Sequence, residues 1–157
     1  MRTPHHSLST LFLDANVLIS AAWKDGAETG RIWDLDKARL VTSGYVMVEV
    51  QRNLPHISQI ERLRGLLTAV ELLNFRELPE RQEFGLLPLK DRPVLSGAVA
   101  AGANYLITGD KKHFSHWFGK TICDTTVTFP SDAFICSGTF YAAPGHPRTR
   151  FGCPRGR

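Results

Sequence analysis

The chain has 157 residues, of which 43% are hydrophobic and 22% are charged, and these proportions are typical of one soluble globular domain. No apolar run approaches the roughly 18–20 residues that a transmembrane helix needs, so we expect no membrane span. The net charge of +4 does not by itself indicate nucleic-acid binding, because all 15 acidic residues but only 15 of the 19 basic residues precede residue 137.

The two ends of the chain differ in composition from its middle. The first ten residues, MRTPHHSLST, lack the apolar core of a signal peptide. Three cysteines form no metal-binding spacing, so we expect reduced thiols in a cytoplasmic protein. Residues 137–157 are rich in Gly, Pro and Arg and contain no acid. They predict a disordered tail after a domain that spans residues 1–136.

Apolar runs and helical spacings predict alternating strands and helices along that domain. In the first half we expect a strand over 11–13, helices over 17–23 and 28–38, a strand over 40–42, and helices over 45–53 and 57–73. Ser43 is placed to cap the helix over 45–53. In the second half we expect a short strand or an extended linker over 75–78, a helix over 94–103, strands over 105–107 and 125–129, and short helices over 111–118 and 130–134.

This alternation predicts an α/β fold, a three-layer α/β/α sandwich around a mostly parallel sheet. Four acids then fall at comparable places. Asp14 ends the first strand, Asp110 follows the strand over 105–107, Asp91 opens the helix before it, and Glu49 lies on the helix after the second strand. Ligands bind outside the carboxyl ends of the strands in such sheets, so we expect the four carboxylates to converge there.

Structural roles for these acids remain open. Asp91 can be a helix N-cap, Asp110 can be a turn residue after Gly109, and Glu49 can pair with Arg52 three residues on. For Asp14 a functional role is favoured over a structural one, because an acid at the end of a buried strand is rarely buried without a partner or a metal.

Four converging carboxylates cannot all stay ionised without compensation, and a hard divalent cation compensates them. Mg²⁺ or Mn²⁺ takes oxygen ligands and keeps several waters. A metal pair can activate a water and stabilise both oxygens of an in-line phosphodiester displacement. Three small polar residues are available to support such a site, namely Asn16, Ser43 and Thr108.

The chain from residue 11 to residue 134 resembles a PIN domain. LFLDANVLISA resembles the first acidic motif of that family, TSGYVMVEVQRNL the second, and KDRPVLSGAVAAGANYLITGDKKHF the third and fourth. VTFP and SDAF resemble its closing element. The basic tail after Cys136 departs from the family pattern, and we assign it no function.

The resemblance implies a metal-dependent ribonuclease with Mg²⁺ or Mn²⁺ at an acidic site made of Asp14, Glu49, Asp91 and Asp110. It also implies supporting roles for Asn16 and Thr108. Within the family, the sequence is most similar to bacterial toxins of toxin–antitoxin pairs. This similarity implies an RNA substrate, an antitoxin partner, a homodimer and a cytoplasmic location.

Basic and aromatic residues near the acids have two interpretations each. Four basic residues either contact phosphates or are only solvated at the surface, namely Arg52, Lys90, Lys111 and Lys112. Aromatic residues beside these lysines, within 113–118, can stack on bases, although they are more often core.

Two other functions compete with the nuclease. LFLDAN superficially resembles the nucleophile strand of a haloacid-dehalogenase-type phosphatase, but Asn16 stands where that chemistry needs a second acid. A PIN-like module that binds RNA or protein without cutting is the other alternative, although none of its four acids is missing. A Ser/Cys–His hydrolase is disfavoured, because the sequence has no nucleophile-elbow pattern.

Overall fold

The computed structural model describes residues 8–134 and 150–151. In this part of the chain a seven-stranded sheet has the order β3-β2-β1-β4-β6-β5-β7. The strands are β1 (Ser9–Leu13), β2 (Ala38–Ser43), β3 (Val70–Leu73), β4 (Tyr105–Ile107), β5 (Thr121–Ile122), β6 (Thr125–Thr128) and β7 (Arg150–Phe151). All neighbouring strands pair in parallel except β5 and β6, which form an antiparallel hairpin.

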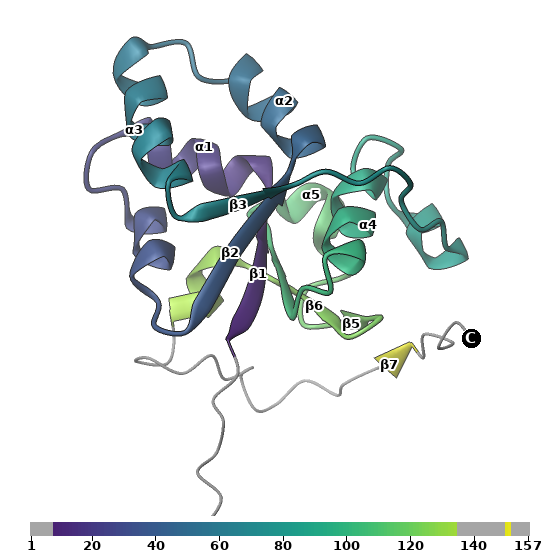
Figure 1. The fold of residues 1–157 in the computed structure, drawn as a ribbon. Coiled ribbons are helices and arrows are strands. Elements are labelled where there is room, and N and C mark those ends of the chain that lie inside the picture. The colour runs from purple at the N-terminus through teal and green to yellow at the C-terminus, as the bar shows by residue number, and fades with distance from the viewer. Residues whose placement is uncertain (1–7, 135–149, 152–157) are drawn as a thin grey trace, which may run out of the picture.

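Helices cover both faces of this sheet. The α-helices are α1 (Ala15–Trp23), α2 (Gly44–Arg52), α3 (Ile57–Leu67), α4 (Arg92–Ala100) and α5 (Lys111–Phe114), and the 3₁₀ helices are η1 (Glu28–Asp34), η2 (Gln82–Leu86) and η3 (Pro130–Phe134). Figure 1 shows α1 and α3 on one side of the sheet and α4 on the other. The predicted three-layer α/β/α architecture with a mostly parallel sheet is therefore confirmed.

The core is organised around β1, an interior strand of the sheet between β2 and β4. Leu11, Phe12 and Leu13 are all completely buried, because helices pack on both faces of the strand. Burying side chains of this size stabilises the fold by roughly 1.5–3 kcal/mol each. The strand is therefore a rigid base for Asp14, the residue that follows it.

Local signals in the sequence account for the ends of α2 and α4. Ser43 caps α2, since its hydroxyl accepts a hydrogen bond from the Val46 N–H at 3.4 Å, as predicted. Pro93 lies in the first turn of α4. Gly102 follows that helix with a φ of +63°, a conformation that glycine adopts without strain.

Three predicted elements need correction. The helix predicted over 57–73 ends at Leu67, and Val70–Leu73 forms the strand β3 beside β2. The indole N–H of Trp33 donates to the Leu66 carbonyl at 3.0 Å, which satisfies one of the carbonyls left free where the helix stops. The segment over 75–78 forms no strand, so the extended linker that the sequence also allowed is the observed state.

The other two corrections concern residues 28–38 and 111–118. The first of these helices is the 3₁₀ helix η1 and ends at Asp34, because β2 already begins at Ala38. The second, α5, is a single turn that ends at Phe114. The strand β5 was not predicted. It pairs with β6 in an antiparallel hairpin. The two turn residues, Cys123 and Asp124, have φ angles of 47° and 67°, which suit a tight hairpin turn.

The predicted domain boundary at residue 136 and the predicted tail over 137–157 lie outside the described residues, apart from the two residues of β7. That prediction stays untested.

Candidate metal centre

The candidate site forms where the carboxyl ends of β1 and β4 lie side by side. Leu13 pairs with Ile107, and the Asp14 N–H donates to the Ile107 carbonyl at 3.0 Å. The residues that follow the two strands are therefore neighbours. In Figure 1 β1 points towards the region of α2 and α5, and β4 runs parallel to β1, so groups at the start of the neighbouring helices reach the same edge.

One part of the site, which we call the buried half, consists of Asp14, Asn16, Thr108 and Gly109. Asp14 Oδ1 accepts from the Ala15 N–H at 2.7 Å, and this hydrogen bond caps α1. Asp14 Oδ2 accepts from the Thr108 hydroxyl at 2.8 Å and from the Asn16 amide at 3.0 Å. Three neutral donors thus fix the carboxylate of Asp14.

Asn16 and Thr108 are fixed in turn by the loop after β4. Asn16 Oδ1 accepts from the Gly109 N–H at 2.7 Å, and the Asp110 N–H donates to Thr108 Oγ1 at 3.2 Å. A Cβ atom at Gly109 would lie 3.2 Å from Asn16 Oδ1, so the loop approaches Asn16 closely because this residue is glycine. The network links both strand ends.

Burial raises the pKa of Asp14 from 3.8 to about 6, although hydrogen bonds from Thr108 and Ala15 oppose the shift. The negative charges of Glu49 and Asp91 raise this pKa further. The side chain of Asp14 is thus costly to ionise in the protein alone, and a cation at the site would offset that cost.

The other part, which we call the open half, consists of Asp91, Asp110 and His113. Both oxygens of Asp110 face His113. Oδ1 accepts from the His113 backbone N–H at 3.1 Å, and Oδ2 lies 2.7 Å from Nδ1 of the imidazole. Partial burial raises the pKa of Asp110, but the bonds with His113 and Lys112 outweigh it and the pKa lies below its usual value.

Asp91 stands at the N-terminus of α4 without capping it, since its side chain accepts no capping hydrogen bond in the described structure. Its Oδ2 atom lies 3.3 Å from His113 Nδ1. Among the described residues, this oxygen is the buried side-chain polar atom without a hydrogen-bond partner. Burial raises the pKa of Asp91, and the charges of His113 and Lys90 oppose the shift.

Glu49 lies on α2 at the edge of this group. Its side chain is exposed, and its negative charge raises the pKa of Asp14. The pKa of Tyr45 is also raised, mainly by burial and then by the charge of Glu49. The ion pair with Arg52 that the sequence allowed is not formed among the described residues. Ser43 is buried and serves as the cap of α2.

The structure thus separates the structural roles that the sequence left open. Asp110 does act as a cap, because it accepts from the His113 N–H at the start of α5. Asp91 does not cap α4, and Glu49 does not pair with Arg52, so neither structural explanation accounts for these two carboxylates.

The four basic candidates are all exposed, namely Arg52, Lys90, Lys111 and Lys112. The Lys111 ammonium lies 4.6 Å from the centre of the Phe129 ring, a cation–π geometry. Phe114 and Trp117 are buried in the core, so neither ring is open to stack on a base. Their core interpretation is confirmed.

Sequence reasoning missed His113. The sequence pattern included it only among the aromatic residues within 113–118 that can stack on bases or pack in the core. The spacing D-x-x-H was the available signal, because a residue three positions after a helix N-cap faces back towards the cap. A histidine there brings a ring nitrogen to the capping carboxylate.

The residues fit a hard divalent cation. Asp91, Asp110 and His113 each offer a ligand atom within 4.8 Å of the others, and this group could bind a metal. The unpartnered Asp91 Oδ2 is an acceptor that a cation would satisfy. The carboxylates around it supply the oxygen donors that Mg²⁺ and Mn²⁺ prefer.

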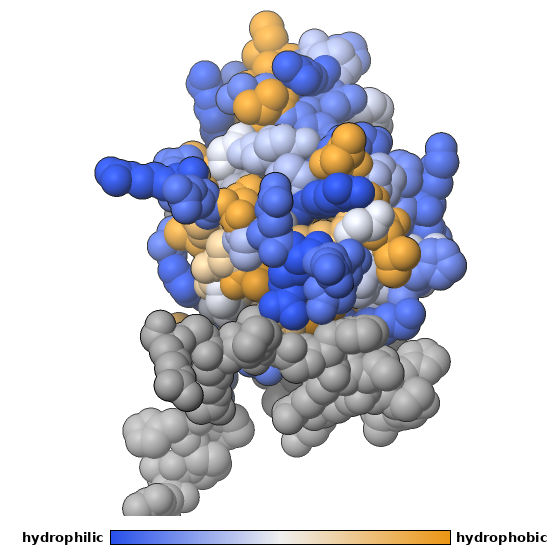
Figure 2. All heavy atoms as spheres, turned by 90° about the vertical axis from the view of Figure 1, so that its right-hand side faces the viewer, coloured by the Kyte–Doolittle hydropathy of each residue, from blue (hydrophilic) through white to orange (hydrophobic). Residues whose placement is uncertain are grey.

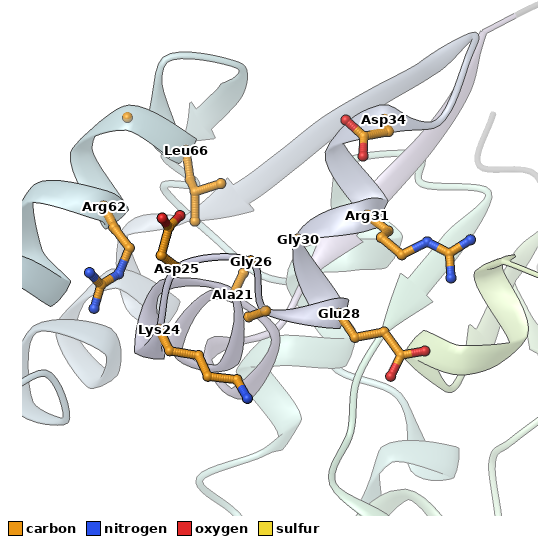
Figure 3. A pocket seen from close by; sticks show the side chains of 12 residues that line it. Ala21, Lys24, Asp25, Gly26, Glu28, Gly30, Arg31, Asp34, Arg62 and Leu66 are labelled. Carbon is orange, nitrogen blue, oxygen red and sulfur yellow. The ribbon is translucent and has the colours of Figure 1, made fainter.

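A separate pocket of about 720 Å³ lies between the end of α1, η1 and α3. Figure 3 shows charged side chains of both signs around it, including Lys24, Asp25 and Arg62. Arg62 donates to the carbonyls of Ala22 and Trp23, each at 3.0 Å, and so satisfies the C-terminal end of α1. The pocket shares no lining residue with the acidic site, and Arg62 has a structural role.

No helix in the described part of the chain is long and apolar enough to span a membrane.

Neither protein-family profiles nor curated proteins gave a match to this chain. Among solved structures, the chain is similar to one in the crystal structure of VapBC2 from Rickettsia felis bound to a DNA fragment from their promoter. The TM-score is 0.53 at 16% identity, and the match covers 76% of this chain and 98% of the other. This likeness supports the fold, a mixed α/β sandwich of the PIN-like type.

Proposed function

We propose that this chain is a divalent-metal-dependent ribonuclease and the toxin of a toxin–antitoxin pair. The observation that carries the proposal is the unpartnered, buried oxygen of Asp91 at an edge where Asp14 and Asp110 also meet. Three carboxylates held so close, with no lysine or arginine bridging them in the described structure, suit a site that binds cations.

The residues have different roles in such a site. Asp14, Asp91 and Asp110 hold Mg²⁺ or Mn²⁺, and Glu49 completes the site directly or through water. When bound, the cation acidifies water and stabilises charge on the phosphate during phosphodiester hydrolysis. Thr108 and Asn16 orient the carboxylate of Asp14 through hydrogen bonds of 2.8 and 3.0 Å. Ser43 keeps its role as the cap of α2.

Exposed basic residues contact the phosphates of the RNA strand. Arg52 on α2, Lys90 before α4 and Lys112 on α5 come from elements that carry the site. Lys111 contributes less, because its ammonium already lies over the Phe129 ring. Such contacts supply affinity but do not read the RNA sequence, so other groups must select the RNA target.

Apolar side chains near the site fit a protein partner, which we propose to be an antitoxin. Val48 on α2 is 48% exposed, and Leu86 and Leu89 before α4 are 77% and 76% exposed. Figure 2 shows hydrophobic areas set among hydrophilic ones on the face that Figure 1 has at its right. The chain of similar fold comes from a structure of VapBC2 bound to a DNA fragment from their promoter, and this likeness supports a paired partner here.

The test is cleavage of a mixed single-stranded RNA by the full chain with Mn²⁺, with EDTA, and with the variants Asp14→Asn and Asp36→Asn. We expect cleavage that needs Mn²⁺, that Asp14→Asn abolishes and that Asp36→Asn leaves intact, because Asp36 is exposed and outside the site. Equal cleavage by Asp14→Asn would refute the site. Binding of RNA without cleavage would favour the silent binding module.

The toxin role has its own test. Expression of the active chain in bacteria should arrest growth, whereas Asp14→Asn should not, and co-expression of a cognate antitoxin should restore growth. Static light scattering of the purified protein tests the proposed homodimer. Growth that continues despite an active nuclease would contradict the toxin role but leave the ribonuclease in place.

A further inference from the structure

We propose that His113 is a positioning residue that sets the separation between the Asp91 and Asp110 carboxylates before a cation binds. This inference rests on the proposed metal-dependent function. Asp91 belongs to the start of α4 and Asp110 to the start of α5, and the two segments are far apart in sequence. The described contacts that join their side chains run through the imidazole of His113.

The imidazole acts as a donor through Nδ1. This nitrogen lies 2.7 Å from Asp110 Oδ2 and 3.3 Å from Asp91 Oδ2, and both neighbours are carboxylate oxygens. An ionised carboxylate only accepts hydrogen bonds, so the 2.7 Å contact with Asp110 places a proton on Nδ1. Protonated Nδ1 has no lone pair for a metal ion, so this nitrogen orients the carboxylates around the cation instead of binding it.

Backbone contacts and packing fix His113 itself. Its own N–H donates to Asp110 Oδ1 at 3.1 Å, so one residue holds both oxygens of Asp110. The next residue, Phe114, is completely buried and anchors the single turn of α5 in the core. The side chain of His113 is only 19% exposed, which limits its freedom to leave the two carboxylates.

The 3.3 Å contact between His113 Nδ1 and Asp91 Oδ2 leaves this oxygen available to a cation. It is too long and poorly aligned to satisfy Oδ2, which remains without a hydrogen-bond partner among the described residues. The arrangement therefore holds Asp110 firmly and Asp91 loosely. We infer that a cation takes Asp91 Oδ2 with little rearrangement, while Asp110 is already in place, as expected for a residue that orients ligands.

The test measures Mn²⁺ affinity by titration calorimetry on the full chain with two variants that differ by one methylene. In His113→Asn the amide nitrogen falls near the position of Nδ1, whereas in His113→Gln it lies one bond farther out. We expect His113→Gln to weaken Mn²⁺ binding by about tenfold or more, the usual loss when such an orienting contact is removed. His113→Asn should stay within about threefold of wild type. The exposed His116 provides the control, His116→Gln, which should bind normally.

Thermal unfolding of each variant separates this role from a purely structural one, since unchanged melting temperatures are expected. Long-range ¹H–¹⁵N spectra of the metal-free protein should show the proton on Nδ1 of His113, and a proton on Nε2 alone would overturn the proposal. Normal Mn²⁺ binding by His113→Gln would overturn it as well. Equal losses in both His113 variants would identify the imidazole as a direct ligand. No Mn²⁺ binding by wild type would refute the metal centre, and this proposal with it.

Discussion

The buried half of the site holds Asp14 with three neutral donors, whereas the open half holds Asp110 and Asp91 beside one imidazole. The pKa of Asp14 rises to about 6 by burial, while that of Asp110 falls below its usual value. The buried half is thus rigid and costly to ionise, and the open half is charged and incompletely paired. The contrast teaches that the two halves hold their carboxylates by different means, neutral hydrogen-bond donors in the buried half and one imidazole in the open half.

The largest effect should come from breaking the buried half. Asp14→Asn keeps the shape of the side chain but removes the charge that a cation needs. We expect RNA cleavage to fall at least about a thousandfold, equivalent to roughly 4 kcal/mol of barrier, because metal coordination supplies several kcal/mol. Initial rates with Mn²⁺ measure this loss, and a circular dichroism spectrum like that of wild type shows that the fold survives.

The pH dependence of stability sharpens the comparison. The folded state favours the protonated form of Asp14, so its contribution is complete below about pH 4 and is lost as pH rises through about 6. We expect metal-free wild type to lose about 3 kcal/mol of unfolding free energy over this range relative to Asp14→Asn. Urea unfolding of both proteins between pH 4 and pH 8 measures the difference, and parallel curves would contradict the raised pKa.

Removing the hydroxyl of Thr108 should be less costly. Thr108→Val has nearly the same shape but leaves Asp14 Oδ2 without its hydroxyl donor and the Asp110 N–H without its acceptor. We expect a loss of about 1–3 kcal/mol of unfolding free energy. Thr29→Val is the control, since the Thr29 hydroxyl pairs with the Ser20 hydroxyl near the surface. Equal effects of the two variants would show that the buried network adds nothing particular.

Asp91→Asn should change stability least. Asp91 Oδ2 has no hydrogen-bond partner among the described residues, so metal-free protein should unfold within about 0.5 kcal/mol of wild type. Mn²⁺ should stabilise wild type but not this variant, because binding to the folded state alone raises stability. Melting temperatures with and without Mn²⁺ test both statements. A large loss in metal-free protein would mean that Asp91 has a structural role.

Much of the fold could be predicted, because its central elements carry strong local signals. The apolar run before Asp14 identified β1, and the boundaries of β4 were predicted as observed. The end of α3 could not be predicted, since residues 68–73 continue the apolar spacing of the helix. Only pairing with β2 makes Val70–Leu73 a strand. The strand β5 has two residues, which are too few to give a periodic signal.

The site was predictable to a smaller extent. Strand ends and a helix start put Asp14, Asp91 and Asp110 at one edge, and the structure brings these three side chains into one electrostatic group. His113 was missed because its role depends on the turn of α5 and on the approach of Asp91 from another element. The D-x-x-H spacing signals the first of these, but the approach of Asp91 is not visible in a pattern of residue types. The catalytic roles of all these residues remain predictions.

The most direct measurement compares RNA cleavage by wild type and Asp91→Asn, each with Mn²⁺ and with EDTA. We predict that wild type cuts RNA only with Mn²⁺ and that Asp91→Asn, although folded and equally stable without metal, does not cut under either condition. Cleavage that persists in EDTA, or an Asp91→Asn protein that cuts at the wild-type rate, would contradict the central claim that these carboxylates form a catalytic metal centre.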